Sequence, residues 1–173
     1  MDILTKLAIK YKTDKWGKHH YTPIYHDLFK DKKESVKKVI EIGVAEGAGV
    51  RMFRDYFPNA MIYGAELEEE RLFEEDRIKV VKCNQWLLDD LVRLVEVTGK
   101  DVDLVVDDGS HVPEDQVASC IALMSMLDKD VTYIIEDVAD VGIMGKLSKF
   151  DLELVVCGER YDDRLLIVRH KNE

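Results

Sequence analysis

Residues 103–111, Asp-Leu-Val-Val-Asp-Asp-Gly-Ser-His, form a short apolar run that ends abruptly in two carboxylates. Residues 133–137, Tyr-Ile-Ile-Glu-Asp, repeat this design. Such runs are typical of buried parallel strands, and open α/β folds bind their ligands at the carboxyl ends of those strands. We therefore expect four acids to meet at one edge of a sheet, with His111 one turn beyond the first pair: Asp107, Asp108, Glu136 and Asp137.

The chemistry of these side chains indicates an active site. Carboxylate oxygens suit a hard cation such as Mg²⁺, and an imidazole can take a proton at neutral pH. Negative charge is also favoured at helix N-termini, which would explain a single acid without any function. Two pairs at neighbouring strand ends repel each other, however, and this favours a cation or a catalytic role.

A strand, a glycine-rich turn and a helix precede this region. A strand with the apolar residues Val39, Ile40 and Ile42 is followed by Gly-Val-Ala-Glu-Gly-Ala-Gly at 43–49 and then by a helical pattern that includes Val50 and Phe53. Such a turn lets a ligand approach the backbone and the helix N-terminus, although many turns need glycine only for steric reasons. The next strand, 60–65, ends at Glu66, which either hydrogen-bonds a ribose or belongs to the solvated acidic run that follows.

The rest of the chain continues to alternate between strands and helices. Strands are predicted at 78–81, 102–106 and 131–135, with helices after the third strand and from Pro113, and two closing strands at 152–156 and 165–168. This order predicts an α/β fold, a Rossmann-like three-layer sandwich. Its sheet is expected to be mainly parallel and seven-stranded, with a C-terminal antiparallel strand pair.

The N-terminal part has a different pattern. Residues 2–10 have the spacing of a short amphipathic helix, whereas residues 13–25, TDKWGKHHYTPIY, are too aromatic for a linker and too irregular for a helix. They are typical of a ligand-binding loop, or alternatively Trp16, Tyr21 and Tyr25 cover one end of the core. We predict that residues 1–35 cover the site and that residues 36–173 form the core domain.

Composition limits the partners. A chain of 173 residues with 46% hydrophobic content fits one domain, and its net charge of −10 argues against nucleic acid or an anionic membrane as partner. Small molecules are the expected partners. The three cysteines lack metal-site spacing, and the N-terminus resembles neither a signal peptide nor a membrane span, so a cytoplasmic location is expected.

Five motifs occur together in order: TDKW at 13–16, HHYTP at 19–23, EIGV at 41–44, DDGSH at 107–111 and IED at 135–137. Their combination resembles the class I S-adenosylmethionine-dependent methyltransferases, and most closely the Mg²⁺-dependent sugar O-methyltransferases of macrolide biosynthesis. The resemblance implies S-adenosylmethionine and Mg²⁺ as cofactors and a sugar or another small vicinal diol as acceptor. It implies His111 as the general base, Asp108, Glu136 and Asp137 as metal ligands, and a set of cofactor-binding residues: Lys15, His19, Tyr21, Glu41, Gly43, Gly47, Glu66, Asn84, Gln85 and Asp107.

The resemblance leaves alternatives open. A catechol-type O-methyltransferase, another Mg²⁺-dependent enzyme such as a phosphohydrolase or phosphotransferase, and a non-catalytic S-adenosylmethionine-binding protein all remain. The phosphate chemistries are disfavoured because no phosphate-cradling lysine motif is found. Compared with the family, the chain has a short N-terminal region and little room for a helix after the second strand. A homo-oligomer is expected, because a neighbouring subunit would complete such a compact site.

Overall fold

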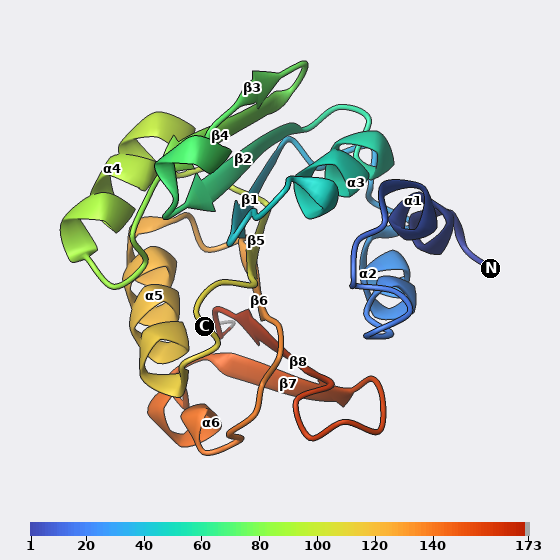
Figure 1. The fold of residues 1–173 in the computed structure, drawn as a ribbon. Coiled ribbons are helices and arrows are strands. Elements are labelled where there is room, and N and C mark those ends of the chain that lie inside the picture. Colours follow the sequence, from blue (N-terminus) through green and yellow to red (C-terminus); the bar gives the residue numbers. More distant parts are fainter. Residues whose placement is uncertain (172–173) are drawn as a thin grey trace.

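The computed structural model describes residues 1–171 and has three layers, with a central sheet between two sets of helices (Figure 1). The sheet has the strand order β3-β4-β2-β1-β5-β6-β8-β7. Five neighbouring strands are parallel to one another: β4, β2, β1, β5 and β6. Strand β8 pairs antiparallel with β6, and β7 pairs antiparallel with β8. The strand bounds are β1 Lys38–Ile42, β2 Met61–Glu66, β3 Glu74–Glu75, β4 Ile78–Lys82, β5 Leu104–Asp107, β6 Thr132–Ile135, β7 Asp151–Val156 and β8 Arg164–Arg169.

Each face of the sheet has its own apolar core. The helices α1 Ile3–Tyr11, α2 Thr22–Phe29 and α3 Ala48–Tyr56 contribute buried residues to one core. The helices α4 Leu88–Thr98, α5 Pro113–Met126 and α6 Ile143–Lys146 contribute to the other. This arrangement confirms the predicted Rossmann-like α/β sandwich with its C-terminal antiparallel pair.

Three local features differ from the sequence prediction. The sheet has eight strands rather than seven, because the two-residue β3 pairs with β4 in the segment expected to be a solvated acidic run. Residues 22–25 are helical, because Pro23 is accommodated in the first turn of α2 and Tyr25 and Phe29 lie buried on one helix face. The segment between β6 and β7 contains the short helix α6, which the sequence pattern did not predict.

The strand register brings distant residues to one edge. Ile42 at the end of β1 pairs with Ala65 of β2 on one side and with Asp107 of β5 on the other. Asp107 in turn pairs with Ile135 at the end of β6. The residues that follow these pairs therefore emerge together at the carboxyl edge: Gly43, Glu66, Asp108 and Glu136.

The N-terminal segment packs firmly on this framework. Asp2 caps α1 by accepting a hydrogen bond from the backbone N–H of Thr5, and Asp55 of α3 accepts hydrogen bonds from Lys10 and Tyr11 at the other end of α1. The proposed boundary near residue 35 stays a prediction, and the last two residues of the predicted core domain, 172 and 173, lie outside the described residues. Within residues 1–171, no helix combines the length and apolar character needed to cross a membrane.

Candidate active site

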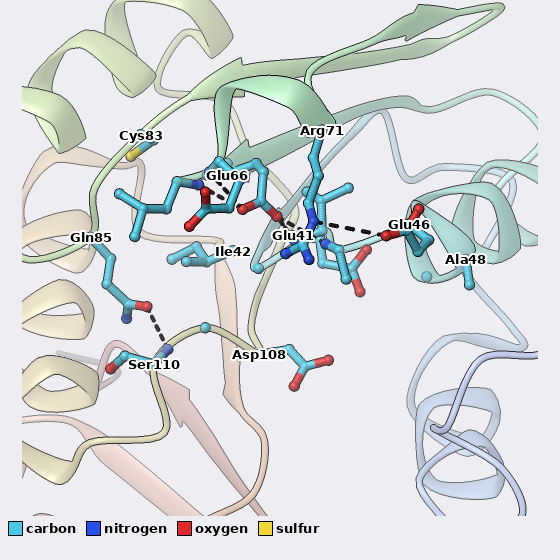
Figure 2. Close-up of a pocket in the computed structure, with 18 of the residues that line it drawn as sticks. Glu41, Ile42, Glu46, Ala48, Glu66, Arg71, Cys83, Gln85, Asp108 and Ser110 are labelled. Carbon is cyan, nitrogen blue, oxygen red and sulfur yellow. Dashed lines mark hydrogen bonds and ion pairs between the residues drawn. The ribbon is translucent and has the colours of Figure 1, made fainter.

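A cavity of about 590 Å³ opens at the carboxyl edge of the sheet (Figure 2). It lies between the glycine-rich turn after β1, the ends of β2 and β4, and the loop after β5. This volume is in the range of small-molecule and cofactor sites. Of the residues assigned to the site from sequence, eight line the cavity: Lys15, Glu41, Gly43, Glu66, Asn84, Gln85, Asp108 and His111.

The glycine-rich turn packs closely against its neighbours. Gly43 has a φ of +81°, and a Cβ placed there would lie 2.2 Å from the backbone oxygen of Asp108. A Cβ on Gly49 would lie 2.2 Å from Oε1 of Glu41, so the first turn of α3 packs directly on that carboxylate. Gly47 also has a positive φ and is the N-cap of α3, but it does not line the cavity. The glycines therefore serve tight packing as well as the approach of a ligand.

Glu41 is a buried acid with unused hydrogen-bonding capacity. Its side chain is 2% exposed, and its Oε2 atom has no hydrogen-bond partner among the described residues. Burial raises the pKa of this carboxyl to about 7, although the neighbouring Lys15 ammonium opposes the shift. Because Glu41 lines the cavity, its free oxygen is available to a cationic or hydrogen-bond-donating group of a ligand.

Glu66 braces the turn from the end of β2. Its Oε2 accepts from the backbone N–H groups of Val44 and Ala45, and its Oε1 accepts from those of Leu67 and Glu68. Burial alone would raise the pKa of Glu66, but these four hydrogen bonds lower it below its ordinary value. A ribose contact by Glu66 stays a prediction, and it requires a ligand hydroxyl to share or replace one of these donors.

Gln85 connects the ends of β4 and β5. Its amide nitrogen donates to Asp107 at 3.2 Å, and its amide oxygen accepts from the backbone N–H of Ser110 at 2.8 Å (Figure 2 shows the second bond). Asp107 is fully buried and does not line the cavity, and it accepts hydrogen bonds from Tyr133 and Ser119. Asp107 therefore supports the cavity wall from behind. Sequence reasoning did not identify its two hydroxyl partners.

Three candidate catalytic side chains meet beside the cavity. Ligand atoms of Asp108, His111 and Asp137 all lie within 4.8 Å of one another. His111 Nε2 is 3.9 Å from Asp108 Oδ1 and 3.8 Å from Asp137 Oδ2. His111 and Asp137 have φ values of 56° and 52°, a left-handed conformation that non-glycine residues rarely adopt outside functional sites and turns. The two carboxylates offer oxygen ligands of the kind that a small divalent cation binds, and the imidazole lies beside them.

Glu136, the third predicted metal ligand, lies deeper. It is 1% exposed, its Oε1 accepts from the Tyr25 hydroxyl at 2.6 Å, and its Oε2 accepts from Lys15 Nζ at 2.6 Å. Both oxygens are therefore already hydrogen-bonded. Direct ligation by Glu136 stays a prediction, and it requires one of these two donors to give way or to share its oxygen.

The N-terminal segment also contacts the acids. Tyr21 donates to Asp137 Oδ1 at 2.5 Å, and His19 Nδ1 lies 2.7 Å from Asp163 Oδ1. His19 and Tyr21 do not line the cavity, so direct contact with a cofactor stays a prediction for both. The sequence does not predict the contact with Asp163, because nothing in its spacing links it to residue 19. Tyr25, which donates to Glu136, lies one helical turn beyond Tyr21. This spacing could have identified Tyr25 as another partner of the acids.

The charges around the cavity are unevenly distributed. Most of the charged side chains that line it are acids, and Lys15 already contacts three carboxylates: Glu41, Asp108 and Glu136. Burial lowers the pKa of Lys15, but the three carboxylates raise it well above its ordinary value. Arg71 is different, because its guanidinium has one loose ion pair, 3.8 Å to Glu46, and no side-chain hydrogen bond within residues 1–171. Figure 2 shows the ion pair between Arg71 and Glu46 as a dashed line.

The fold and the site together define a class. The mostly parallel sheet with its C-terminal antiparallel pair is that of the class I S-adenosylmethionine-dependent methyltransferases. The chain has this fold, as its sequence motifs indicated. No protein-family model matches the chain.

Relatives with similar sequences are named O-methyltransferases. The 8-demethyl-8-alpha-L-rhamnosyl tetracenomycin-C 2'-O-methyltransferase of Streptomyces olivaceus is 32% identical over 141 residues, which are 78% of this chain and 37% of the relative. Demethylmacrocin O-methyltransferase of Streptomyces fradiae is 34% identical over 142 residues, which are 78% of this chain and 36% of that protein. The chain thus spans little more than a third of the length of these relatives.

Solved structures with a similar fold include a methyltransferase. The MycE methyltransferase from the mycinamycin biosynthetic pathway, in complex with Mg, SAH and mycinamycin VI, superposes with a TM-score of 0.81 and 25% identity, covering 97% of this chain and 54% of that one. The CmcI protein in its apo structure gives a TM-score of 0.66 at 16% identity, which supports the fold alone.

Proposed function

We propose that the chain transfers a methyl group from S-adenosylmethionine to a hydroxyl of a small-molecule acceptor, with Mg²⁺ as the metal. The preferred acceptor is a sugar or another vicinal diol. The observation that carries the proposal is the placement of His111 between Asp108 and Asp137 at the wall of a cofactor-sized cavity. The names of the relatives and the ligands of the MycE complex support the donor, the metal and the acceptor class.

The cavity has two ends that suit the two parts of the donor. Asn84, Gln85 and Trp86 line one end, where an adenine base would find amide groups and an aromatic ring. Glu41 and Arg71 line the other end, where the amino-acid part of the donor carries an ammonium and a carboxylate. The unpartnered oxygen of Glu41 would accept from the ammonium, and the guanidinium of Arg71 would bind the carboxylate.

The acids and the histidine have separate tasks. A bound Mg²⁺ would supply Lewis-acid polarisation that lowers the pKa of an acceptor hydroxyl. Asp108 Oδ1 and Asp137 Oδ2, which both face His111, would hold that ion. His111 Nε2, which lies close to these two carboxylates, would take the proton from the hydroxyl. Positioning the donor and the acceptor in line accounts for the rest of the rate enhancement.

Two measurements test this function. Calorimetric titration with S-adenosylmethionine in the presence of Mg²⁺ is expected to show saturable micromolar binding. A methyl-transfer assay over rhamnosylated and other glycosylated acceptors, with catechols as the comparison set, then identifies the acceptor class. The variant His111→Gln should lose turnover and keep the affinity for S-adenosylmethionine. Full turnover by this variant, or no cofactor binding by the native chain up to millimolar concentration, would refute the proposal.

The remaining partner proposals follow from composition. The net charge of −10 continues to argue against nucleic acid as the acceptor. A homo-oligomer stays a proposal, and light scattering of the purified protein tests it directly.

A further inference from the structure

Lys15 is a cation in an unusual place. Its side chain is 2% exposed, and its Nζ lies 2.6 Å from Glu136 Oε2, 2.7 Å from Asp108 Oδ2 and 3.3 Å from Glu41 Oε1. Lysine is almost never fully buried unless it is paired. Here one ammonium contacts three acids that arrive from three different strands.

The acids need such a cation when no metal is present. Glu41 and Glu136 are each 2% exposed at the side chain, and the loss of one partner from a buried charge pair is strongly destabilising because it leaves an uncompensated charge. Among the described residues, Lys15 is the cationic side chain within 4.0 Å of Glu41 and of Glu136. The fold of this edge therefore depends on it.

The N-terminal segment also divides the oxygens of the acids into two sets. Lys15 contacts Oδ2 of Asp108, and Tyr21 contacts Oδ1 of Asp137. The other oxygen of each carboxylate, Asp108 Oδ1 and Asp137 Oδ2, faces His111 Nε2. One oxygen of each acid is thus tied down, while the second is directed to the place where a metal would bind.

Lys15 is held rigidly enough for this task. The loop around Gly17 is closed by backbone hydrogen bonds from His19 N–H to Asp14 oxygen at 3.0 Å and from Tyr21 N–H to Lys15 oxygen at 3.1 Å. Trp16 and His20 form a bridge within the same loop. The ammonium is therefore delivered by a closed loop rather than by a freely moving arm.

We propose that Lys15 is a built-in counter-cation of the acidic edge, a positioning residue that keeps Asp108 and Glu136 assembled without a divalent ion, so that the metal binds a preformed site. The divalent metal site in this proposal rests on the proposed function, whereas the counter-cation role of Lys15 does not. In this role Lys15 acts through the acids. Its loss should make the stability of the protein depend on divalent cations.

Thermal unfolding of Lys15→Met tests this role. In EDTA the variant should melt roughly 10 °C below the native chain, because three acids share one site without a cation. Mg²⁺ should raise the melting temperature of the variant by more than it raises that of the native chain, because the ion replaces the missing charge. Lys18→Met is the matched control, since Lys18 lies in the same loop, is 49% exposed and pairs only with Asp14.

A second variant separates charge from packing. The double variant Lys15→Met/Glu136→Gln lacks one of the uncompensated charges. In EDTA it should recover part of the melting temperature that Lys15→Met loses. If Lys15→Met alone does not fold, the double variant should still do so. An unchanged melting temperature in Lys15→Met, or no recovery in the double variant, would overturn the role of Lys15. If Mg²⁺ shifts neither protein while the EDTA results appear as expected, the counter-cation role stands and the divalent site of the proposed function is refuted.

Discussion

Arg71 offers the sharpest test of how the donor lies in the cavity. If its guanidinium binds the carboxylate of the amino-acid part, Arg71→Met should weaken ligands that carry this carboxylate and leave others unchanged. Hydrogen bonds to charged groups contribute about 1.5–3 kcal/mol. The Arg71 side chain is 42% exposed, so solvent screening favours the lower limit, and we expect a loss of about tenfold in affinity.

Two ligands make this measurement specific. Titration calorimetry would compare S-adenosylhomocysteine, which has the carboxylate, with 5'-methylthioadenosine, which lacks the whole amino-acid part. Arg71→Met should bind the first about tenfold more weakly and the second with native affinity. Arg169→Met is the control, because Arg169 has a similar exposure of 35% and lies on β8 with Glu153 as its partner.

Two results would refute the reasoning about Arg71. An equal loss for both ligands would mean that Arg71 shapes the cavity as a whole or contacts the adenosine part. Native affinity for both would mean that the carboxylate of the donor is bound elsewhere in the cavity.

Three further substitutions test the framework around the site, each measured by urea unfolding. Gly43→Ala should lower the free energy of unfolding by more than about 2 kcal/mol, because φ is +81° and the new Cβ would meet a backbone oxygen at 2.2 Å. Gly145→Ala is the control and should not destabilise the protein, because the space around Gly145 is open. Equal effects of the two substitutions would contradict this. Partial burial raises the pKa of Asp55, but three side-chain hydrogen bonds outweigh it and lower this pKa to about 2. The stabilisation by the Asp55 carboxylate is therefore complete above its ordinary pKa and is lost as the pH falls toward 2. Asp55→Asn should therefore lose about 1 kcal/mol at pH 7 and less at pH 2, and a loss independent of pH would disprove the assignment. Tyr133→Phe removes a hydroxyl that donates to the buried Asp107 at 2.8 Å, and it should lower the free energy of unfolding by about 1.5–3 kcal/mol. A loss below about 0.5 kcal/mol would contradict this role of Tyr133.

Much of the cavity could be predicted from sequence. The glycine-rich turn, the acid at the end of β2 and the acids after β5 and β6 all lie where the strand pattern placed them. The reason is physical: strand patterns are local, and parallel strands deliver their carboxyl ends to the same edge. His111 was found in the same way, because it closes the loop that Asp108 begins.

The partners of those acids could not be predicted. Tyr133 and Ser119, which support Asp107, look in the sequence like an ordinary strand residue and an ordinary helix residue. Arg71 lies in an acidic run whose pattern indicates only a solvated loop. In each case the deciding contact joins elements whose relative placement follows from packing of the sheet and helices, and single residues carry no signal of it.

The sequence by itself determined the α/β order, the carboxyl edge and the identity of the chemical groups on that edge, because hydrophobic periodicity and strand ends are properties of short segments. Only the tertiary structure decided how these groups are used. Lys15 contacts Asp108 and Glu136 across 93 and 121 residues of sequence, and this contact determines which carboxylate oxygens are tied down and which face His111. Such a choice depends on distances of a few ångströms between side chains, which arise only when the N-terminal segment packs on the finished sheet.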